Sequence, residues 1–186
     1  MDPELKKNRR GVTLVFTGNG KGKTTAAMGL ALRAAGNRMP VRVIQFIKGS
    51  WKTGERTAFS EWVPSVEIAA EGRGFTIESL RDHAIPMEEH VEAGHNAWQS
   101  AVEAVTSGRY RLVVLDEVLG SITAGLVAEA DLVSLMRSKP ADLHLVLTGR
   151  GAPQSVIDTA DCVTEMREVK HHYRGAGIPA QRGIEF

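Results

Sequence analysis

A glycine-rich stretch near the beginning of the chain, TGNGKGKTT at residues 17–25, contains the residue types that bind a chain of phosphates. Glycines allow backbone N–H groups to turn toward an anion, Lys23 supplies a mobile cation, and the hydroxyl of Thr24 can hold Mg²⁺. An apolar run precedes this stretch and a helical pattern follows it. Because strand, glycine turn and helix come in this order, we predict a phosphate-binding loop rather than an ordinary turn with a surface lysine.

The loop departs from the usual pattern G-x-x-x-x-G-K-[ST], because Thr17 stands where that pattern has its first glycine. Gly18 is the first glycine here, and only three residues separate it from Gly22. We interpret the loop as one residue tighter than usual, which would place its phosphates in a different register. The pattern alone therefore does not make the γ-phosphate the group that is attacked.

Two acids end the most strand-like run of the chain, RLVVLDE at residues 111–117. Asp116 is the better candidate for holding a metal, and Glu117 lies next to it for a metal, a ribose or a water. Acids also occur at strand ends without any function. Combined with the glycine loop, however, this pair indicates a site for a magnesium–nucleotide, although the two motifs do not identify the group that is transferred.

The elements that must position these residues alternate between strands and helices. Apolar, β-branched runs predict strands, and apolar residues three and four apart predict helices. We expect strands at 12–17, 41–47, 66–69, 111–117, 143–149 and 162–166, helices at 23–36, 86–108, 128–138 and 153–159, and a loop with short ordered pieces at 48–62. This alternation predicts a single α/β domain over residues 11–186, with a mostly parallel sheet flanked by helices, after a flexible lead-in at 1–10.

The composition limits the classes of function. With 186 residues, of which 42% are hydrophobic, the chain suits one core, and 23 Lys and Arg against 22 Asp and Glu create no global attraction to nucleic acid or membranes. The single cysteine, Cys162, excludes an internal disulfide, and we predict it to be a buried strand residue. No apolar stretch approaches the ~18 residues of a membrane span. We therefore expect a cytoplasmic protein that binds neither nucleic acid nor membranes.

Five motifs follow one another along residues 11–186: FTGNGKGKTTAAMGLALRA, EGRGFT, VVLDE, LTGRG and EVKHHYRGAGIPAQRGIEF. Together they resemble the P-loop ATP:corrinoid adenosyltransferases, whose own loop has this tight form. The resemblance implies a RecA-like sheet and a transferase of adenosylcobalamin biosynthesis or salvage. In that reaction the Co(I) of a reduced corrinoid attacks C5′ of ATP and expels triphosphate, with Mg²⁺ or Mn²⁺ as the metal. It also implies that ATP lies along the loop in the reverse of the ordinary sense.

The resemblance assigns roles by position. Lys23 would be catalytic, because it would stabilise the negative charge that grows on the leaving triphosphate. Arg33 and Arg150 would lie near the nucleotide, with Glu117 at the ribose or the metal. Thr24, Asp116 and Glu117 would hold the metal. The residues that would bind the triphosphate are Asn19, Gly20, Lys21, Gly22, Lys23, Thr24 and Thr25.

Members of the family carry an aromatic pair in the turn after the third strand, which covers the lower face of the corrin and displaces its axial base. Phe75 and Ile77 match that pair by position, and Ile77 stands where tryptophan is better known. An isoleucine excludes water but has no flat plane to lie under the ring. We hypothesise that Phe75 carries the displacement and that Ile77 leaves room for a different or truncated lower ligand; ordinary hydrophobic packing is the alternative.

The resemblance also implies partners. Such enzymes are typically homodimers, and an electron-donating flavoprotein is a candidate source of the reduced corrinoid. An N-terminal segment often covers the corrinoid of the partner subunit, and the ten polar residues before Gly11 are short for that task. The glycine-rich tail from Arg174 either closes over the site or runs along the surface.

Two other functions fit the glycine loop. A small-molecule kinase or NTPase would need a general base near the γ-phosphate, for which Asp116 and Glu117 are the visible candidates. A non-catalytic, ATP-dependent switch module would need a partner surface, and the sequence shows no dedicated one.

Overall fold

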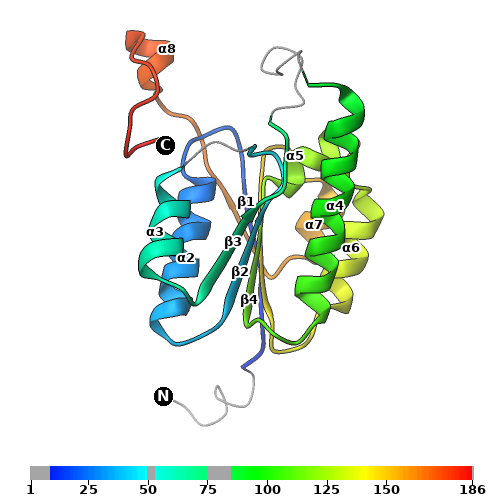
Figure 1. Ribbon diagram of the computed structural model, residues 1–186. Coiled ribbons are helices and arrows are strands. Elements are labelled where there is room, and N and C mark those ends of the chain that lie inside the picture. The colour runs from blue at the N-terminus through cyan, green and yellow to red at the C-terminus, as the bar shows by residue number, and fades with distance from the viewer. Residues whose placement is uncertain (1–8, 50–52, 75–84, 186) are drawn as a thin grey trace.

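Six parallel strands form a single sheet within residues 9–49, 53–74 and 85–185, which are the residues that the computed structural model describes (Figure 1). Their order across the sheet is β3-β2-β4-β5-β1-β6. The strands are β1 Thr13–Thr17, β2 Val41–Gln45, β3 Val66–Ala70, β4 Leu112–Asp116, β5 His144–Thr148 and β6 Cys162–Glu165. The predicted α/β class with a parallel, P-loop NTPase-like sheet is thus confirmed.

Helices cover both faces of this sheet (Figure 1). One face carries α2 Lys23–Gly36 and α3 Gly54–Trp62. The other face carries α4 Met87–Thr106, α5 Val118–Thr123, α6 Glu129–Ser138 and α7 Gln154–Thr159. Each face has its own core, because Ala27 and Phe59 pack with Val43 on the first side, whereas Leu115 and Leu132 belong to the second. Strands buried between two such layers show the continuous apolar runs that the sequence displays.

The strand order determines where the polar residues gather. β5 lies between β1, which leads into the glycine loop, and β4, which ends in the two acids. All neighbouring strands run parallel, so their carboxyl ends lie along the same edge. Ligands of open α/β sheets bind at this edge. The loop after Thr17 and the acid at Asp116 therefore face the same space.

Three helices differ from the sequence-based expectation, and one of them, α8 His172–Ala176, lies in the tail, where we predicted no helix. α3 lies where we predicted a loop with short ordered pieces, and Phe59 is its one buried residue. With only nine residues, α3 presents an apolar pattern too short to stand out from the polar segment around it. α5 has only six residues and begins directly after Glu117, the last residue of the strand predicted at 111–117, in a stretch for which we predicted no helix. The other strands and helices begin and end within a few residues of their predicted limits.

The β6 edge of the sheet is more exposed than we predicted. β6 pairs only with β1, at Leu14↔Cys162, and all of its residues are exposed. The prediction of a buried Cys162 is therefore wrong, because its strand lies at the edge instead of inside the sheet. No helix among the described residues is long and apolar enough to cross a membrane.

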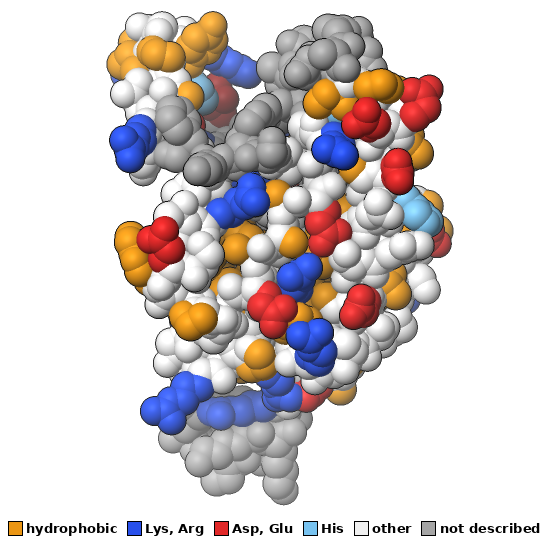
Figure 2. All heavy atoms as spheres, in the orientation of Figure 1, with side chains coloured by type: hydrophobic (Ala, Val, Ile, Leu, Met, Phe, Trp, Pro, Cys, Tyr) orange, Lys and Arg blue, Asp and Glu red, His pale blue; other side chains and the backbone are white. Residues whose placement is uncertain are grey.

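The tail beyond β6 stands apart from the sheet layers and contains the short helix α8, His172–Ala176 (Figure 1), and hydrophobic side chains gather on the surface of this part of the molecule (Figure 2). Several large hydrophobic side chains are exposed along it, namely those of Val169, Tyr173, Ile178 and Ile184. The tail then returns to the carboxyl edge of the sheet, next to the glycine loop.

Candidate active site

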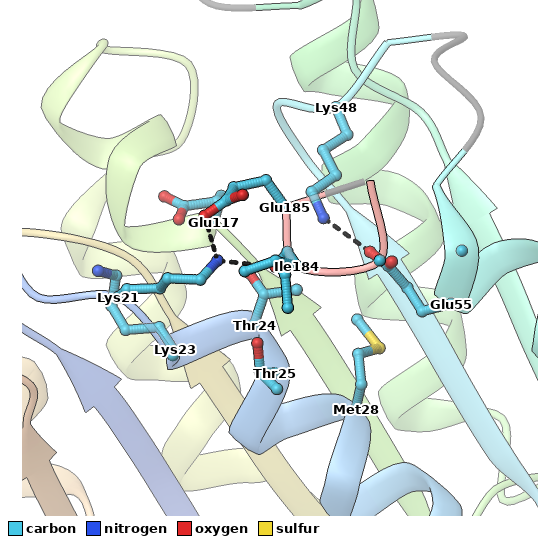
Figure 3. Close-up of a pocket in the computed structure, with 13 residues that line it drawn as sticks. Lys21, Lys23, Thr24, Thr25, Met28, Lys48, Glu55, Glu117, Ile184 and Glu185 are labelled. Atoms are coloured by element: carbon cyan, nitrogen blue, oxygen red, sulfur yellow. Dashed lines mark hydrogen bonds and ion pairs between the residues drawn. The ribbon is translucent and has the colours of Figure 1, made fainter. Parts of the chain in front are cut away.

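A cavity of about 460 Å³ opens at the carboxyl edge of the sheet (Figure 3). The glycine loop and the first turns of α2 form one side and the floor, and the loop after β2 with the start of α3 forms the opposite side. The end of the tail lies against the same space. The lining residues are Lys21, Gly22, Lys23, Thr24, Thr25, Met28, Lys48, Gly54, Glu55, Glu117, Gly183, Ile184 and Glu185.

Lys23 lies at the centre of the glycine loop and is 7% exposed. Its Nζ donates hydrogen bonds to the carbonyl oxygens of Gly18 at 2.8 Å and Gly20 at 2.9 Å. Burial lowers the pKa of Lys23, and Arg150 acts in the same direction, whereas the carboxylate of Glu117 opposes it. No carboxylate of the described residues forms an ion pair with Lys23, so the loop holds a cation whose charge an anionic ligand would neutralise.

The glycines of the loop are required by close packing against the chain after β6. Gly20 N–H donates to the carbonyl oxygen of Met166 at 2.6 Å. A Cβ atom added to Gly20 would lie 2.7 Å from that oxygen, and one added to Gly18, whose φ is +94°, would lie 2.5 Å from it. Only glycine fits such approaches. The loop is therefore shaped before any ligand binds.

Asp116 is fully buried and accepts hydrogen bonds on both oxygens. Thr24 and Thr148 donate their hydroxyls to Oδ1, each at 2.8 Å, and Gln45 donates Nε2 to Oδ2 at 3.1 Å. Lys48 Nζ lies 3.9 Å from Oδ2. The sequence prediction that Asp116 and Thr24 act together is thus matched by a direct contact between them.

The donor set suits Mg²⁺ or Mn²⁺. Thr24, Asp116 and Glu117 offer only oxygen atoms, which these hard cations prefer. Both oxygens of Asp116 are already hydrogen-bonded, so this carboxylate fits a contact through metal-bound water better than a direct bond. Across the described residues no group of three His, Cys, Asp or Glu side chains could enclose a metal by itself. Such a site agrees with a cation that shares its ligands with phosphates and water.

Glu117 has an unusual backbone. Its φ is 62°, in the left-handed region, and its N–H donates to the hydroxyl of Thr148 at 2.9 Å. A non-glycine residue held there costs about 1–3 kcal/mol and is typical of functional sites. Burial raises the pKa of Glu117, and the neighbouring Asp116 raises it further, while three nearby cations oppose the shift. This acid is therefore held against the cavity with a weakened tendency to ionise.

The sequence analysis missed both charged residues of the wall opposite the glycine loop, Lys48 and Glu55. Lys48 follows β2, and its Nζ donates to Glu55 Oε1, in the first turn of α3, at 2.9 Å. We had read this segment as a loop, and no short motif marks it. Thr53-Gly54-Glu55, an N-cap residue followed by an acid in the first turn, is the signal that could have located the start of α3.

The end of the tail lines the cavity. Of the two paths considered for the tail, it therefore follows the one that closes over the site and not the one along the surface. Lys21 Nζ donates to the carbonyl oxygen of Ile184 at 2.9 Å and lies 3.3 Å from Glu185 Oε1. His172 Nε2 lies 3.6 Å from the same oxygen. Lys21, predicted to bind phosphate, therefore also binds the end of the tail.

The remaining predicted site residues lie in three places. Asn19 and Arg150 line a neighbouring cavity of about 510 Å³ on the β6 side of the loop. Arg33 is exposed in the last turn of α2, ten residues and about 15 Å along the helix from Lys23. The structure does not bring Arg33 to the loop of its own chain. Phe75 and Ile77 lie outside the described residues.

Known proteins with similar sequences show the family to which this chain belongs. Residues 9–186 match a sequence model described as ATP:corrinoid adenosyltransferase BtuR/CobO/CobP. The chain is 40% identical to a corrinoid adenosyltransferase of Pseudomonas aeruginosa, over 97% of this chain and 86% of that one. It is 37% identical to the corrinoid adenosyltransferase CobA of Salmonella typhimurium and 36% identical to that of Escherichia coli, each over 97% of this chain and 88% of the other. Since the match spans both the loop and the acids around the cavity, the chain belongs to the ATP:corrinoid adenosyltransferase family.

Proposed function

We propose that the cavity binds ATP with its metal and that the protein transfers the 5′-deoxyadenosyl group to the Co(I) of a reduced corrinoid. The family match supports the reaction. One observation of the structure supports this cavity as the site where ATP binds. The cation of Lys23, the N-terminus of α2 and the Thr24–Asp116 pair converge on one end of the cavity. That end is a cradle for a polyphosphate.

In the reaction, C5′ of ATP gains one bond and loses another. The Co(I) electron pair forms a bond to C5′, the C5′–O5′ bond breaks, and its electrons leave with the triphosphate. Lys23 and the backbone N–H groups at the start of α2 stabilise the charge that grows on this leaving group. Thr24, and Asp116 through water, would hold Mg²⁺, which supplies further neutralisation of the triphosphate when bound.

We propose that Phe75 displaces the axial base at the lower face of the corrin and that Ile77 leaves room for a different or truncated lower ligand. Replacement of Phe75 by Ala should slow turnover that starts from Co(II) far more than turnover that starts from chemically prepared Co(I), because only the first route needs the axial base displaced. Equal slowing of both would contradict the role. A homodimer, a flavoprotein electron donor and a cytoplasmic location complete the proposal.

The products test the function directly. The protein is incubated with Mg-ATP and chemically reduced cobalamin under exclusion of oxygen, and the light-sensitive cobalt–carbon chromophore and the phosphate products are followed. We expect the chromophore together with one triphosphate per transfer. ADP and phosphate without the chromophore would indicate the kinase or NTPase function instead. Bound but unconverted ATP would indicate the switch module.

A further inference from the structure

The two ends of the cavity offer different chemistry to a ligand. Lys21 and Lys23 lie on the side of the glycine loop, and Glu55 and Lys48 lie on the opposite side, beyond Met28 (Figure 3). The first end holds the buried cation of Lys23 and the N-terminus of α2, and its second lysine, Lys21, is paired with Glu185. The second end pairs one acid with one base, so its charges cancel.

Two acids compete with a phosphate for Lys48 in this arrangement. Its Nζ is hydrogen-bonded to Glu55 Oε1 at 2.9 Å and also lies 3.9 Å from Asp116 Oδ2. Burial raises the pKa of Glu55, but the hydrogen bond and charge of Lys48 outweigh it and hold the pKa below its usual value. Glu55 therefore stays an ionised acceptor at neutral pH. A carboxylate paired in this way gives a phosphate no net attraction, but its free lone pairs can accept hydrogen bonds from neutral donors such as hydroxyl groups.

Along the floor of the cavity, the positive potential of α2 also decreases from the first end to the second. Thr24 and Thr25 belong to the first turn of α2, where the partial positive charge of the helix is concentrated. Met28 comes about 6 Å further along the axis, at ~1.5 Å per residue, where that charge has faded. Phosphates consequently belong over the first turn. The uncharged part of a nucleotide belongs over Met28, against Glu55.

We propose that Glu55 accepts hydrogen bonds from the ribose hydroxyl groups of ATP and that Lys48 positions it. This inference rests on the proposed function, which identifies the ligand as ATP. It adds Glu55 as the residue that distinguishes ribose from deoxyribose. A carboxylate is a common partner of nucleotide ribose hydroxyls. A carboxylate offers about four acceptor positions, and Lys48 occupies one of them, so capacity for a diol remains.

Glu117 is the competing acceptor, because its side chain also lines the cavity and the sequence predicted it at the ribose or the metal. The two acids come from different walls: Glu117 follows β4, and Glu55 starts α3. Matched carboxylate-to-amide substitutions at the two positions therefore separate the assignments.

Equilibrium binding without corrinoid tests the proposal. The affinities of ATP, 2′-deoxy-ATP and 3′-deoxy-ATP are measured for the wild type, Glu55→Gln, Glu55→Ala and Glu117→Gln. The wild type should prefer ATP over at least one deoxy analogue by roughly tenfold or more, as expected for a hydrogen bond to a charged acceptor. Glu55→Ala should reduce this ratio to near one, and Glu55→Gln should leave an intermediate value. Glu117→Gln should retain the wild-type ratio.

Lys48 provides the positioning test. Lys48→Ala should lower the ratio of ATP to deoxy-ATP affinity partway, and Lys48→Arg should restore it, because an arginine can still donate to Glu55. A purely structural role would change all three nucleotide affinities equally and leave the ratio unchanged. Such a uniform change would overturn the positioning role.

Equal affinities of the wild type for all three nucleotides would overturn the proposal. Loss of discrimination in Glu117→Gln, with retention in Glu55→Ala, would overturn it as well. The wild-type comparison alters only the ligand, so it stands even where a variant is unstable. The ratio of ATP to deoxy-ATP affinity is measured without corrinoid and does not depend on the reaction. If the product assay gave ADP, adenosyl transfer would be refuted, but a ribose preference that depends on Glu55 would remain.

Discussion

The glycine loop and the end of the tail form two walls of one cavity, but they are held by different forces. On the loop side, Gly18 and Gly20 pack against the backbone of Met166, and Lys23 is buried over its own loop. On the tail side, Lys21 and Glu185 form an ion pair in which the Lys21 side chain is 45% exposed. Buried backbone packing fixes a shape, whereas exposed ion pairs contribute little and are screened by salt. The loop wall is preformed, and the tail wall can be displaced by a ligand.

The strongest test of this difference compares two lysines of the same loop. Lys23→Ala should lower the rate of adenosyl transfer by roughly 10²- to 10³-fold, because it removes a preorganised cation from the leaving group. Lys21→Ala should lower it by less than about tenfold, because Lys21 is exposed and already binds the tail. Initial rates of cobalt–carbon bond formation at saturating ATP measure both. Equal losses would mean that the two walls do not differ in function.

The preformed wall also predicts a difference between two glycines. Gly20→Ala places a methyl group 2.7 Å from the carbonyl oxygen of Met166 and should destabilise the fold by about 1–3 kcal/mol, with weaker ATP binding. Gly29→Ala, in the middle of α2, meets no atom within 4 Å and should stabilise by about 0.5–1 kcal/mol. Thermal unfolding of both variants measures the contrast. An unchanged melting temperature in Gly20→Ala would show that the loop relaxes easily.

The same contrast explains which features the sequence could predict. The strand, glycine turn and helix around Lys23 follow from patterns within about 25 residues, and the structure places Thr24 against Asp116 as those patterns implied. The contact between Lys21 and Ile184 joins residues 163 positions apart. No local pattern encodes such a contact, because it depends on the path of the whole tail.

Errors in the prediction have equally local causes. α3 was missed because its nine residues form a pattern too short to stand out from the polar segment around it. Cys162 was predicted to be buried because its strand resembles an internal one, and a residue pattern does not show which strand lies at the sheet edge. The proposed role of Arg33 near the nucleotide stays a prediction, because this residue lies at the far end of the helix that starts at the loop, about 15 Å from Lys23 at ~1.5 Å per residue.

Within the loop wall, Glu117 should show a pH-dependent effect on stability. Its pKa is raised above the ordinary 4.5, chiefly by burial. The protonated form therefore favours folding, and this contribution is complete below pH 4.5 and lost as the pH rises through the folded pKa. Glu117→Gln, which mimics the neutral acid, should raise the melting temperature of the ligand-free protein at pH 7.5, and the gain should vanish near pH 4.5.

Melting curves between these two pH values test the sign. Glu103→Gln, on the exposed face of α4, is the matched control and should shift the melting temperature little at either pH. A gain for Glu117→Gln that grows as the pH falls would contradict the direction of the pKa shift.

The smallest effect belongs to the tail wall. Hydrogen bonds from the Gln181 N–H and Lys21 lower the pKa of Glu185, so its carboxylate is charged at neutral pH and competes with phosphate for Lys21. Glu185→Gln should therefore tighten ATP binding, by no more than about fivefold, at low ionic strength. The gain should disappear in ~1 M salt, where the Debye length falls to about 3 Å. Glu67→Gln, in the edge strand β3, removes the ion pairs of Glu67 with Arg109 and Arg42 and should leave ATP affinity unchanged. Weaker ATP binding in Glu185→Gln would mean that the tail helps to bind the nucleotide and does not compete with it for Lys21.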